Sequence, residues 1–231
     1  LLAACGDSPA ELHAKAKDAY AARDYTAARL HLAAALKDDG GNREILKLQA
    51  RTLLALGDGE GARVALEKLA AGAPPQGELA EMAALAALLR RKPDVAVELL
   101  AGSQSIEADR LRAVAALQKQ DLAGAAALLG KAVEAGGSAE AFADLARVHL
   151  IRNDLTHAAQ MAERALKAGP DGILPLLVAG EVAARQGDLD RALGHFAKAD
   201  RLYPKNIAAM TGKASVLGEL GRTAEFEAAL A

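Results

Sequence analysis

Histidine imidazoles are the groups in this sequence best suited to metal binding or proton transfer. The five histidines are His13, His31, His149, His157 and His195. No two of them have the spacing of a metal-ligand pair, and His149 and His157 lie eight positions apart on what we expect to be different helices. We therefore interpret the histidines as surface or groove side chains, and we predict neither a metal site nor a cofactor.

Enzyme motifs are also missing from the sequence. No Gly-rich phosphate loop follows a predicted strand, and no nucleophile-elbow pattern occurs. The carboxylates fit helix caps and solvated helix faces, with weak pairs such as Glu163 and Lys167 four positions apart. Because no nucleophile, acid or base stands in a recognisable constellation, we predict no enzymatic role.

The one cysteine, Cys5, stands near the start of the chain. It excludes an intramolecular disulfide framework. The segment Leu1-Leu2-Ala3-Ala4-Cys5 resembles the lipobox of bacterial lipoproteins. That resemblance implies that residues 1–4 are a signal-peptide remnant, that Cys5 is the lipid attachment site, and that residues 5–8 are a tether. Gly6 then implies sorting to the outer membrane, on its periplasmic face. The alternative is a chance match in an alanine-rich chain.

Composition bounds the fold class. The chain has 231 residues, of which 52% are hydrophobic, 25% charged and 3% aromatic, and its formal net charge is −2. Alanine is abundant and is the best helix former, so we predict an all-α protein and exclude β-sandwiches and barrels. The slightly negative net charge gives no sign of a basic surface that would bind nucleic acid. The apolar content excludes global disorder, and the apolar runs are too short to span a bilayer.

A short pattern recurs through the sequence and predicts a helical repeat. A turn residue precedes an aspartate, and an alanine follows four positions later. The pairs are Asp24 and Ala28, Asp58 and Ala62, Asp121 and Ala125, Asp154 and Ala158, and Asp188 and Ala192. Most successive alanines are 34 residues apart, and only the step from Ala96 to Ala125 is much shorter, at 29. A fixed period of this length indicates stacked supersecondary units.

The segments before and after each turn are both predicted to be helices. Apolar-periodic segments of about 12–14 residues lie on both sides, and the aspartate is placed to cap the second helix. In the third unit Lys92-Pro93-Asp94 stands at the turn, and Pro93 suits a first helical position. Ser8-Pro9-Ala10-Glu11 predicts a capping box at the first helix. Prolines and glycines should end the second helices, namely Gly40, Pro74, Gly137, Pro170 and Pro204.

This pattern resembles the tetratricopeptide repeat (TPR) family, which implies a right-handed superhelical solenoid. The array would cover 9–231 in about seven units, near 9–42, 43–76, 77–105, 106–138, 139–172, 173–206 and 207–231. The third unit is shortened at Gly102-Ser103, so its second helix should be short. The last unit is expected to be incomplete, which suggests that the chain is a fragment.

The resemblance implies that the first helix of each unit lines a concave, partner-binding face. Projection of the helical period places these residues there: His13, Lys17, Tyr20, Lys47, Arg51, Arg110, Arg147 and Glu181. The N-terminal part of this row predicts a mildly basic groove for an acidic peptide, a C-terminal carboxylate or an anionic glycan. The alternative is that these are ordinary solvated side chains. The places of the family's carboxylate clamp hold unsuitable residues such as Leu48 and Met82, which disfavours a chaperone adaptor.

The N-terminal stretch resembles TPR lipoproteins of exopolysaccharide export and PEP-CTERM-type surface export. The resulting hypothesis is a non-enzymatic periplasmic scaffold for envelope secretion or assembly, anchored to the outer membrane by lipidated Cys5. Its partner would be a protein or peptide, or an anionic glycan, with no nucleic acid, and self-association through the C-terminal end is plausible. The alternatives are a cytosolic peptide-binding adaptor or regulator, located in the cytoplasm, and a pilotin-like assembly lipoprotein of type IV pili.

Overall fold

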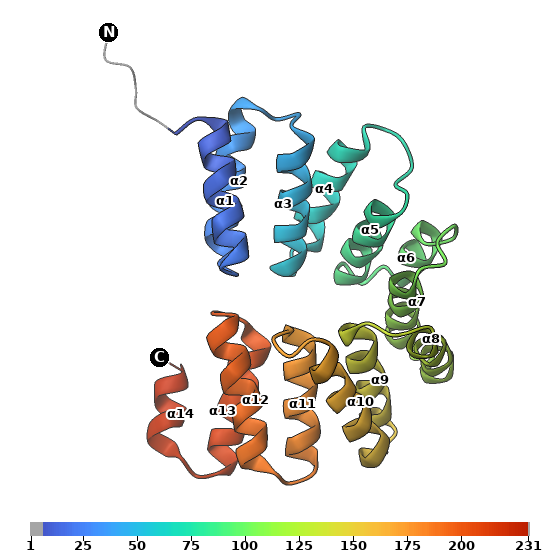
Figure 1. The fold of residues 1–231 in the computed structure, drawn as a ribbon, viewed down its shortest axis with the longest axis vertical. Coiled ribbons are helices and arrows are strands. Elements are labelled where there is room, and N and C mark those ends of the chain that lie inside the picture. The colour runs from blue at the N-terminus through green and yellow to red at the C-terminus, as the bar shows by residue number, and fades with distance from the viewer. Residues whose placement is uncertain (1–6, 231) are drawn as a thin grey trace. The chain divides into compact units, whose positions relative to one another are not determined.

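The computed structural model describes residues 7–230, and side chains up to residue 227. Cys5 and the expected signal remnant lie outside the described residues. The described chain folds entirely into α-helices and loops (Figure 1). The helices are α1 (Pro9–Ala21), α2 (Tyr25–Asp38), α3 (Arg43–Ala55), α4 (Gly59–Ala70), α5 (Glu78–Leu89), α6 (Pro93–Leu99), α7 (Ile106–Gln118), α8 (Leu122–Glu134), α9 (Ala139–Ile151), α10 (Leu155–Ala168), α11 (Ile173–Arg185), α12 (Leu189–Leu202), α13 (Ile207–Glu219) and α14 (Thr223–Leu230).

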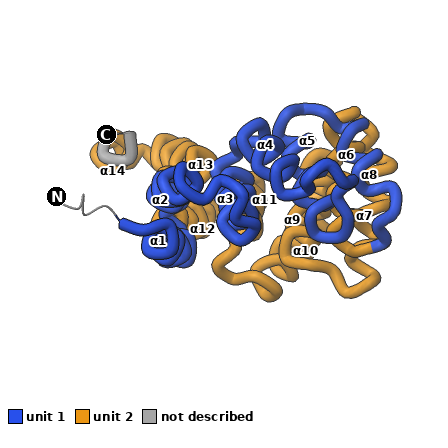
Figure 2. The backbone as a smooth tube through the Cα atoms, turned by 90° about the horizontal axis from the view of Figure 1, so that it is seen from above, with its two compact units in different colours: residues 1–104 blue, residues 105–231 orange. Residues whose placement is uncertain are grey.

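The chain divides into two compact units, residues 1–104 and 105–231 (Figure 2). Within each unit, successive helices pack in pairs, as α1 with α2 or α9 with α10. First helices also contact the first helix of the next pair, as α3 contacts α5 and α9 contacts α11. The predicted all-α array of helix–turn–helix units is therefore confirmed. None of the described helices is long and apolar enough to cross a membrane.

The turn inside five of the helix pairs is held by the aspartate that the sequence pattern marks. The side chains of Asp24, Asp58, Asp121, Asp154 and Asp188 each accept a hydrogen bond from the backbone N–H three residues later. The residue before each aspartate has a positive φ, between 59° and 79°. This left-handed residue ends the first helix, and the aspartate begins the second, so the predicted caps are confirmed.

The third pair is built differently. Its N-cap is Lys92, which makes no side-chain capping bond, and Pro93 occupies the first turn. Helix α6 has only seven residues, as the shortened repeat predicts. The first helix of the chain begins as expected, because Ser8 and Glu11 form a complete capping box.

The cores of the two units differ in their largest side chains. In unit 1, Leu32 and Leu66 fill the space between alanine-lined helices. In unit 2, Phe196 lies between α11 and α13 and is almost fully buried. Glycines make room for its ring, because a Cβ on Gly180 would lie 2.7 Å from Phe196 Cζ, and a Cβ on Gly212 would lie 2.5 Å from Phe196 Cε1. Close helix approach thus depends on small residues beside one large aromatic ring.

Candidate functional site

The predicted basic residues of α3 are neutralised by an acid of the next first helix. Lys47 Nζ lies 2.8 Å from Glu78 Oε2, and Arg51 binds Glu78 Oε1. Hydrogen bonds from Lys47 and Arg51 hold the pKa of Glu78 below its usual value, with burial opposing them. This part of the row is therefore a bridge between α3 and α5, and not the series of uncompensated cations that the sequence suggested.

Two α1 residues of the predicted row, His13 and Tyr20, are partly buried. Burial, followed by the charge of Lys17, lowers the pKa of His13. Tyr20 packs edge-on against Tyr25, with ring centroids 5.3 Å apart, and burial raises its pKa. Lys17 itself is exposed. On α1 the predicted row thus presents the exposed cation of Lys17 beside a histidine that favours its neutral form.

Arg110 differs most from its expected place in an open groove. It is only 8% exposed, and its guanidinium binds Glu107 and Asp144, each at 2.7 Å. Burial opposes the charge of Arg110, but these two carboxylates raise its pKa. Burial raises the pKa of Asp144 in spite of the adjacent guanidinium. The arginine joins α7 to α9 and is not available to a partner.

Arg147 and Glu181 lie together in a groove of about 380 Å³ along α9, α11 and α13. Their nearest charged atoms are 3.3 Å apart. The buried ring of Phe196 lies at the base of this α9–α13 groove, and Ile151 is 60% exposed beside it. Other lining residues are Leu150, Ala184, Arg185, Gly212, Ser215, Val216 and Glu219. Two predicted residues from different repeats thus meet in one surface with apolar and mixed-charge character.

Unit 1 carries a second groove, of about 470 Å³, which sequence reasoning missed. It is bounded by α4, α5, α6 and the loop between α4 and α5. Its apolar lining includes Leu66, Pro74, Pro75, Leu79, Val95 and Leu99. The signal in the sequence was the pair of prolines next to a shortened unit, because a seven-residue helix covers less of its neighbours than a full one.

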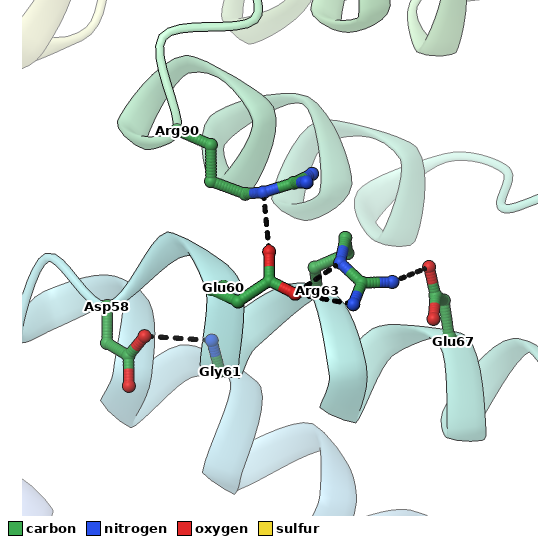
Figure 3. A network of polar contacts seen from close by, with 6 residues as sticks. All are labelled: Asp58, Glu60, Gly61, Arg63, Glu67 and Arg90. Carbon is green, nitrogen blue, oxygen red and sulfur yellow. Dashed lines mark hydrogen bonds and ion pairs between the residues drawn. The ribbon is translucent and has the colours of Figure 1, made fainter.

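Arg63, Glu67 and Arg90 line this α4–α6 groove and belong to a network of ion pairs, which Figure 3 shows. Glu60 binds Arg63 on its own helix, and its second oxygen lies 2.7 Å from Arg90 Nε at the end of α5. Arg63 also binds Glu67. The hydrogen bond from Arg63 is the main reason why the pKa of Glu60 is lowered. The network links α4 to α5 across the surface.

The structure corrects one expectation about the histidines. His149 and His157 do come together, with ring centroids 5.2 Å apart. Asp154 lies between them, its Oδ2 3.3 Å from His149 Nδ1 and 2.7 Å from His157 Nδ1. The eight-residue spacing does not reveal this contact, because the connecting turn folds the last turn of α9 against the first turn of α10.

Antiparallel helix pairs whose first helices share one face define the class of helical-repeat proteins that bind partners on a preformed surface. The sequence matches the family described as tetratricopeptide repeat over residues 13–78, 110–173 and 143–207. These matches span well over half of the chain, which therefore belongs to the tetratricopeptide repeat family. Members of this family typically act as non-catalytic protein-interaction scaffolds. No curated protein matches the chain in sequence.

Solved structures share the fold at low sequence identity. A tetratricopeptide repeat protein from Parabacteroides merdae is 15% identical, with a TM-score of 0.71, over 90% of this chain and 84% of that one. PilW, a type IV pilus biogenesis factor, is 17% identical, with a TM-score of 0.56, over 88% of this chain and 97% of its own. Pseudomonas aeruginosa PilF is 15% identical, with a TM-score of 0.52, over 90% and 97%.

Proposed function

We propose that this protein is a lipid-anchored scaffold of the bacterial envelope that binds protein partners in the α9–α13 groove. The groove is the observation that carries the proposal, because it lies on the first helices of three successive repeats. A preformed surface of this kind binds without large rearrangement of its backbone. The lipobox-like segment that ends at Cys5 supports anchoring at the outer membrane, facing the periplasm.

The chemistry of the α9–α13 groove favours a protein segment over an anionic glycan. Arg147 is paired with Glu181, and the lining holds Glu219 as well as Arg185, so the groove offers little uncompensated positive charge. Ile151, which is 60% exposed at the edge of the groove, supplies apolar contact area instead. A segment with apolar side chains flanked by charges of both signs would match these features. Such mixed polar and apolar composition is typical of non-obligate protein interfaces.

Site-specific photocrosslinking in the native bacterium tests the groove. A photoreactive amino acid replaces Ile151, which is 60% exposed in the groove, or Ile207, which is 79% exposed at the start of α13 and is not a groove residue. We expect a discrete crosslinked product at position 151 that is lost with Arg147→Glu, because this change places two acids side by side. Equal products at both positions, or a product that Arg147→Glu leaves unchanged, would contradict groove binding.

Intact mass spectrometry of the mature N-terminus tests the anchor, with the full-length gene expressed in a bacterium. We expect a diacylglyceryl or triacylglyceryl group on Cys5 and loss of the protein from the membrane fraction in Cys5→Ser. The variant keeps the repeat array and changes only the proposed attachment atom. An unmodified chain that continues upstream of Leu1 would overturn the lipoprotein proposal and favour the cytosolic adaptor.

Two envelope processes fit such a scaffold. The N-terminal resemblance supports exopolysaccharide or PEP-CTERM-type surface export, which is the first candidate. The second candidate is pilus assembly, supported by the fold shared with PilW and PilF over nearly the whole of those chains. Deletion of the gene distinguishes them. Loss of surface polysaccharide with normal pili would support a role in export, and loss of pili with normal surface polysaccharide would support a role in pilus assembly. Self-association through the C-terminal end stays a prediction, which analytical ultracentrifugation tests.

A further inference from the structure

We propose that His149, Asp154 and His157 form a binding site for a divalent transition-metal ion of the Zn²⁺ class. The three side chains meet at the turn between α9 and α10. Two imidazoles and one carboxylate are a donor set that Zn²⁺ and its neighbours in the first transition series accept. The inference is independent of the groove and of the lipid anchor.

The distances suit one ion. The three donor atoms all lie within 4.8 Å of one another, and His149 Nδ1 is 3.3 Å from Asp154 Oδ2. A tetrahedral Zn²⁺ with bonds of about 2.0–2.2 Å separates its ligand atoms by roughly 3.3–3.5 Å. Only the 2.7 Å contact between His157 Nδ1 and Asp154 Oδ2 is shorter, and it is a hydrogen bond that the ion would replace. Rotation of the exposed His157 ring is enough to open it.

His149 supplies a second, independent observation. Its Nδ1 atom is buried and has no hydrogen-bond partner, because its 3.3 Å contact with Asp154 does not have hydrogen-bond geometry. A buried polar atom without a partner costs free energy of folding. A metal bond at Nδ1 would satisfy this atom. The His149 side chain is 19% exposed and His157 is 59% exposed, so solvent reaches the site mainly at His157.

The other aspartate-capped turns show that the repeat does not need histidine here. His149 lies five positions before the capping aspartate and His157 three positions after it. The equivalent pairs in the other four turns are Ala19 and Ala27, Leu53 and Gly61, Ala116 and Gly124, and Ala183 and Arg191. None of these pairs offers a metal ligand. The same backbone turn forms without the two imidazoles, so they are additional to the fold.

Asp154 can serve the helix cap and the ion together. Its Oδ1 accepts the hydrogen bond from the His157 backbone N–H, and its Oδ2 is the atom that faces both imidazoles. One oxygen thus stays on the helix cap while the other is free to bind the ion. With three protein ligands, the ion would keep one position for water or for a donor from a partner.

Calorimetric titration of the chain with ZnCl₂ tests the site. Every sample carries Cys5→Ser, so that the thiol does not contribute. We expect one saturable ion per chain, with affinity lowered at least about tenfold by His149→Ala or His157→Ala, because each removes a ligand. Asp154→Asn should lower affinity in the same way, because asparagine still caps the helix but lacks the charge. His31→Ala on α2 is the matched histidine control and should leave affinity unchanged.

Two results would overturn the proposal. One is the absence of saturable binding up to about one hundred micromolar Zn²⁺. A dissociation constant above that concentration would be too weak for a specific site of this kind. The other is equal affinity in the His149→Ala/His157→Ala double variant and in His31→Ala, which would place the ion elsewhere. Imidazole ¹⁵N spectra give a direct readout, because Zn²⁺ should shift the Nδ1 signals of His149 and His157 together and leave that of His31 in place. Circular dichroism verifies that each variant is folded.

Discussion

Unit 1 links its first helices through ion pairs at the surface, whereas unit 2 has, besides the open Arg147–Glu181 pair, one such ion pair that is buried. In unit 1, Glu78 joins Lys47 and Arg51 at the surface. In unit 2, Arg110 and Asp144 make the equivalent link one repeat apart, but both are buried. The repeat therefore determines where the bridge lies, and the neighbouring side chains determine whether water reaches it. A surface pair contributes little to stability, whereas a buried pair makes the fold sensitive to loss of either partner.

The largest expected effect is the loss of one buried partner. Asp144→Ala leaves the Arg110 guanidinium buried with Glu107 as its remaining partner. We expect the free energy of unfolding to fall by about 3–5 kcal/mol. In unit 1, Glu78→Ala should cost less than about 1 kcal/mol, because the pair is solvated. Urea denaturation followed by circular dichroism measures both changes.

A double substitution checks the cause. Arg110→Met with Asp144→Leu removes both charges and should restore most of the lost stability, because apolar side chains of similar size can replace a buried ion pair. If the double variant is as unstable as Asp144→Ala, packing and not the unpaired charge would explain the loss. Equal costs for Asp144→Ala and Glu78→Ala would remove the contrast between the units.

The next largest effect concerns the aromatic core of unit 2. Gly212→Ala places a Cβ 2.5 Å from Phe196 Cε1, so the ring must shift, and we expect a loss of about 1–3 kcal/mol. Gly194→Ala on α12 meets no atom within 4 Å and should instead stabilise by roughly 0.5–1 kcal/mol through helix propensity. Thermal unfolding measures both, and Phe196→Leu in the Gly212→Ala background should recover part of the loss.

Short-range sequence signals were enough to predict the helical-repeat architecture. The aspartate caps, the capping box at Ser8 and the short α6 all follow from signals within a few residues of each turn. The role of Gly212 was not predictable in the same way. Its need to be small comes from Phe196, which lies sixteen positions earlier and reaches it only through the packing of α12 on α13.

The candidate sites were harder to predict because they depend on which charges meet. Helical periodicity placed Arg110 and Arg147 in one row. It could not show that Arg110 is buried in an ion pair with Asp144, whereas Arg147 pairs with Glu181 in an open groove. His149 and His157 were judged by spacing along the chain, whereas their contact depends on the geometry of the turn. A search for metal-binding side chains five residues before and three residues after each capping aspartate would have found this histidine pair.

A smaller effect is expected at the start of α6, whose N-cap residue makes no side-chain capping bond. Lys92→Ser supplies a side-chain oxygen at the N-cap of α6, where none bonds to the backbone. We expect a gain of about 0.5–1 kcal/mol, measured by urea denaturation. Asp58→Ala removes an existing cap, whose Oδ1 accepts from Gly61 N–H at 2.8 Å, and should cost about 1 kcal/mol. A loss in Lys92→Ser would show that the lysine has a stabilising role of its own.

The smallest expected effect is on the pH dependence of stability, where the two bridges should differ in sign. The pKa of Glu78 is lowered by Lys47 and Arg51, so its contribution is present above the unfolded value of about 4.3 and is lost as pH falls below it. Because Glu78 is half exposed, Glu78→Gln should cost no more than about 0.5 kcal/mol near pH 7, and this cost should vanish in acid.

Burial raises the pKa of Asp144, so the folded chain binds more protons than the unfolded chain above the unfolded value of about 3.9. The stability of the native protein relative to Asp144→Asn should therefore fall as pH rises from that value through the raised pKa, opposite to Glu78. Urea denaturation of the native protein and both variants at several pH values between about 3 and 7 measures the two slopes. Slopes of the same sign would mean that the charge of Arg110 outweighs burial at Asp144, and the predicted contrast in pH dependence between the two bridges would fail.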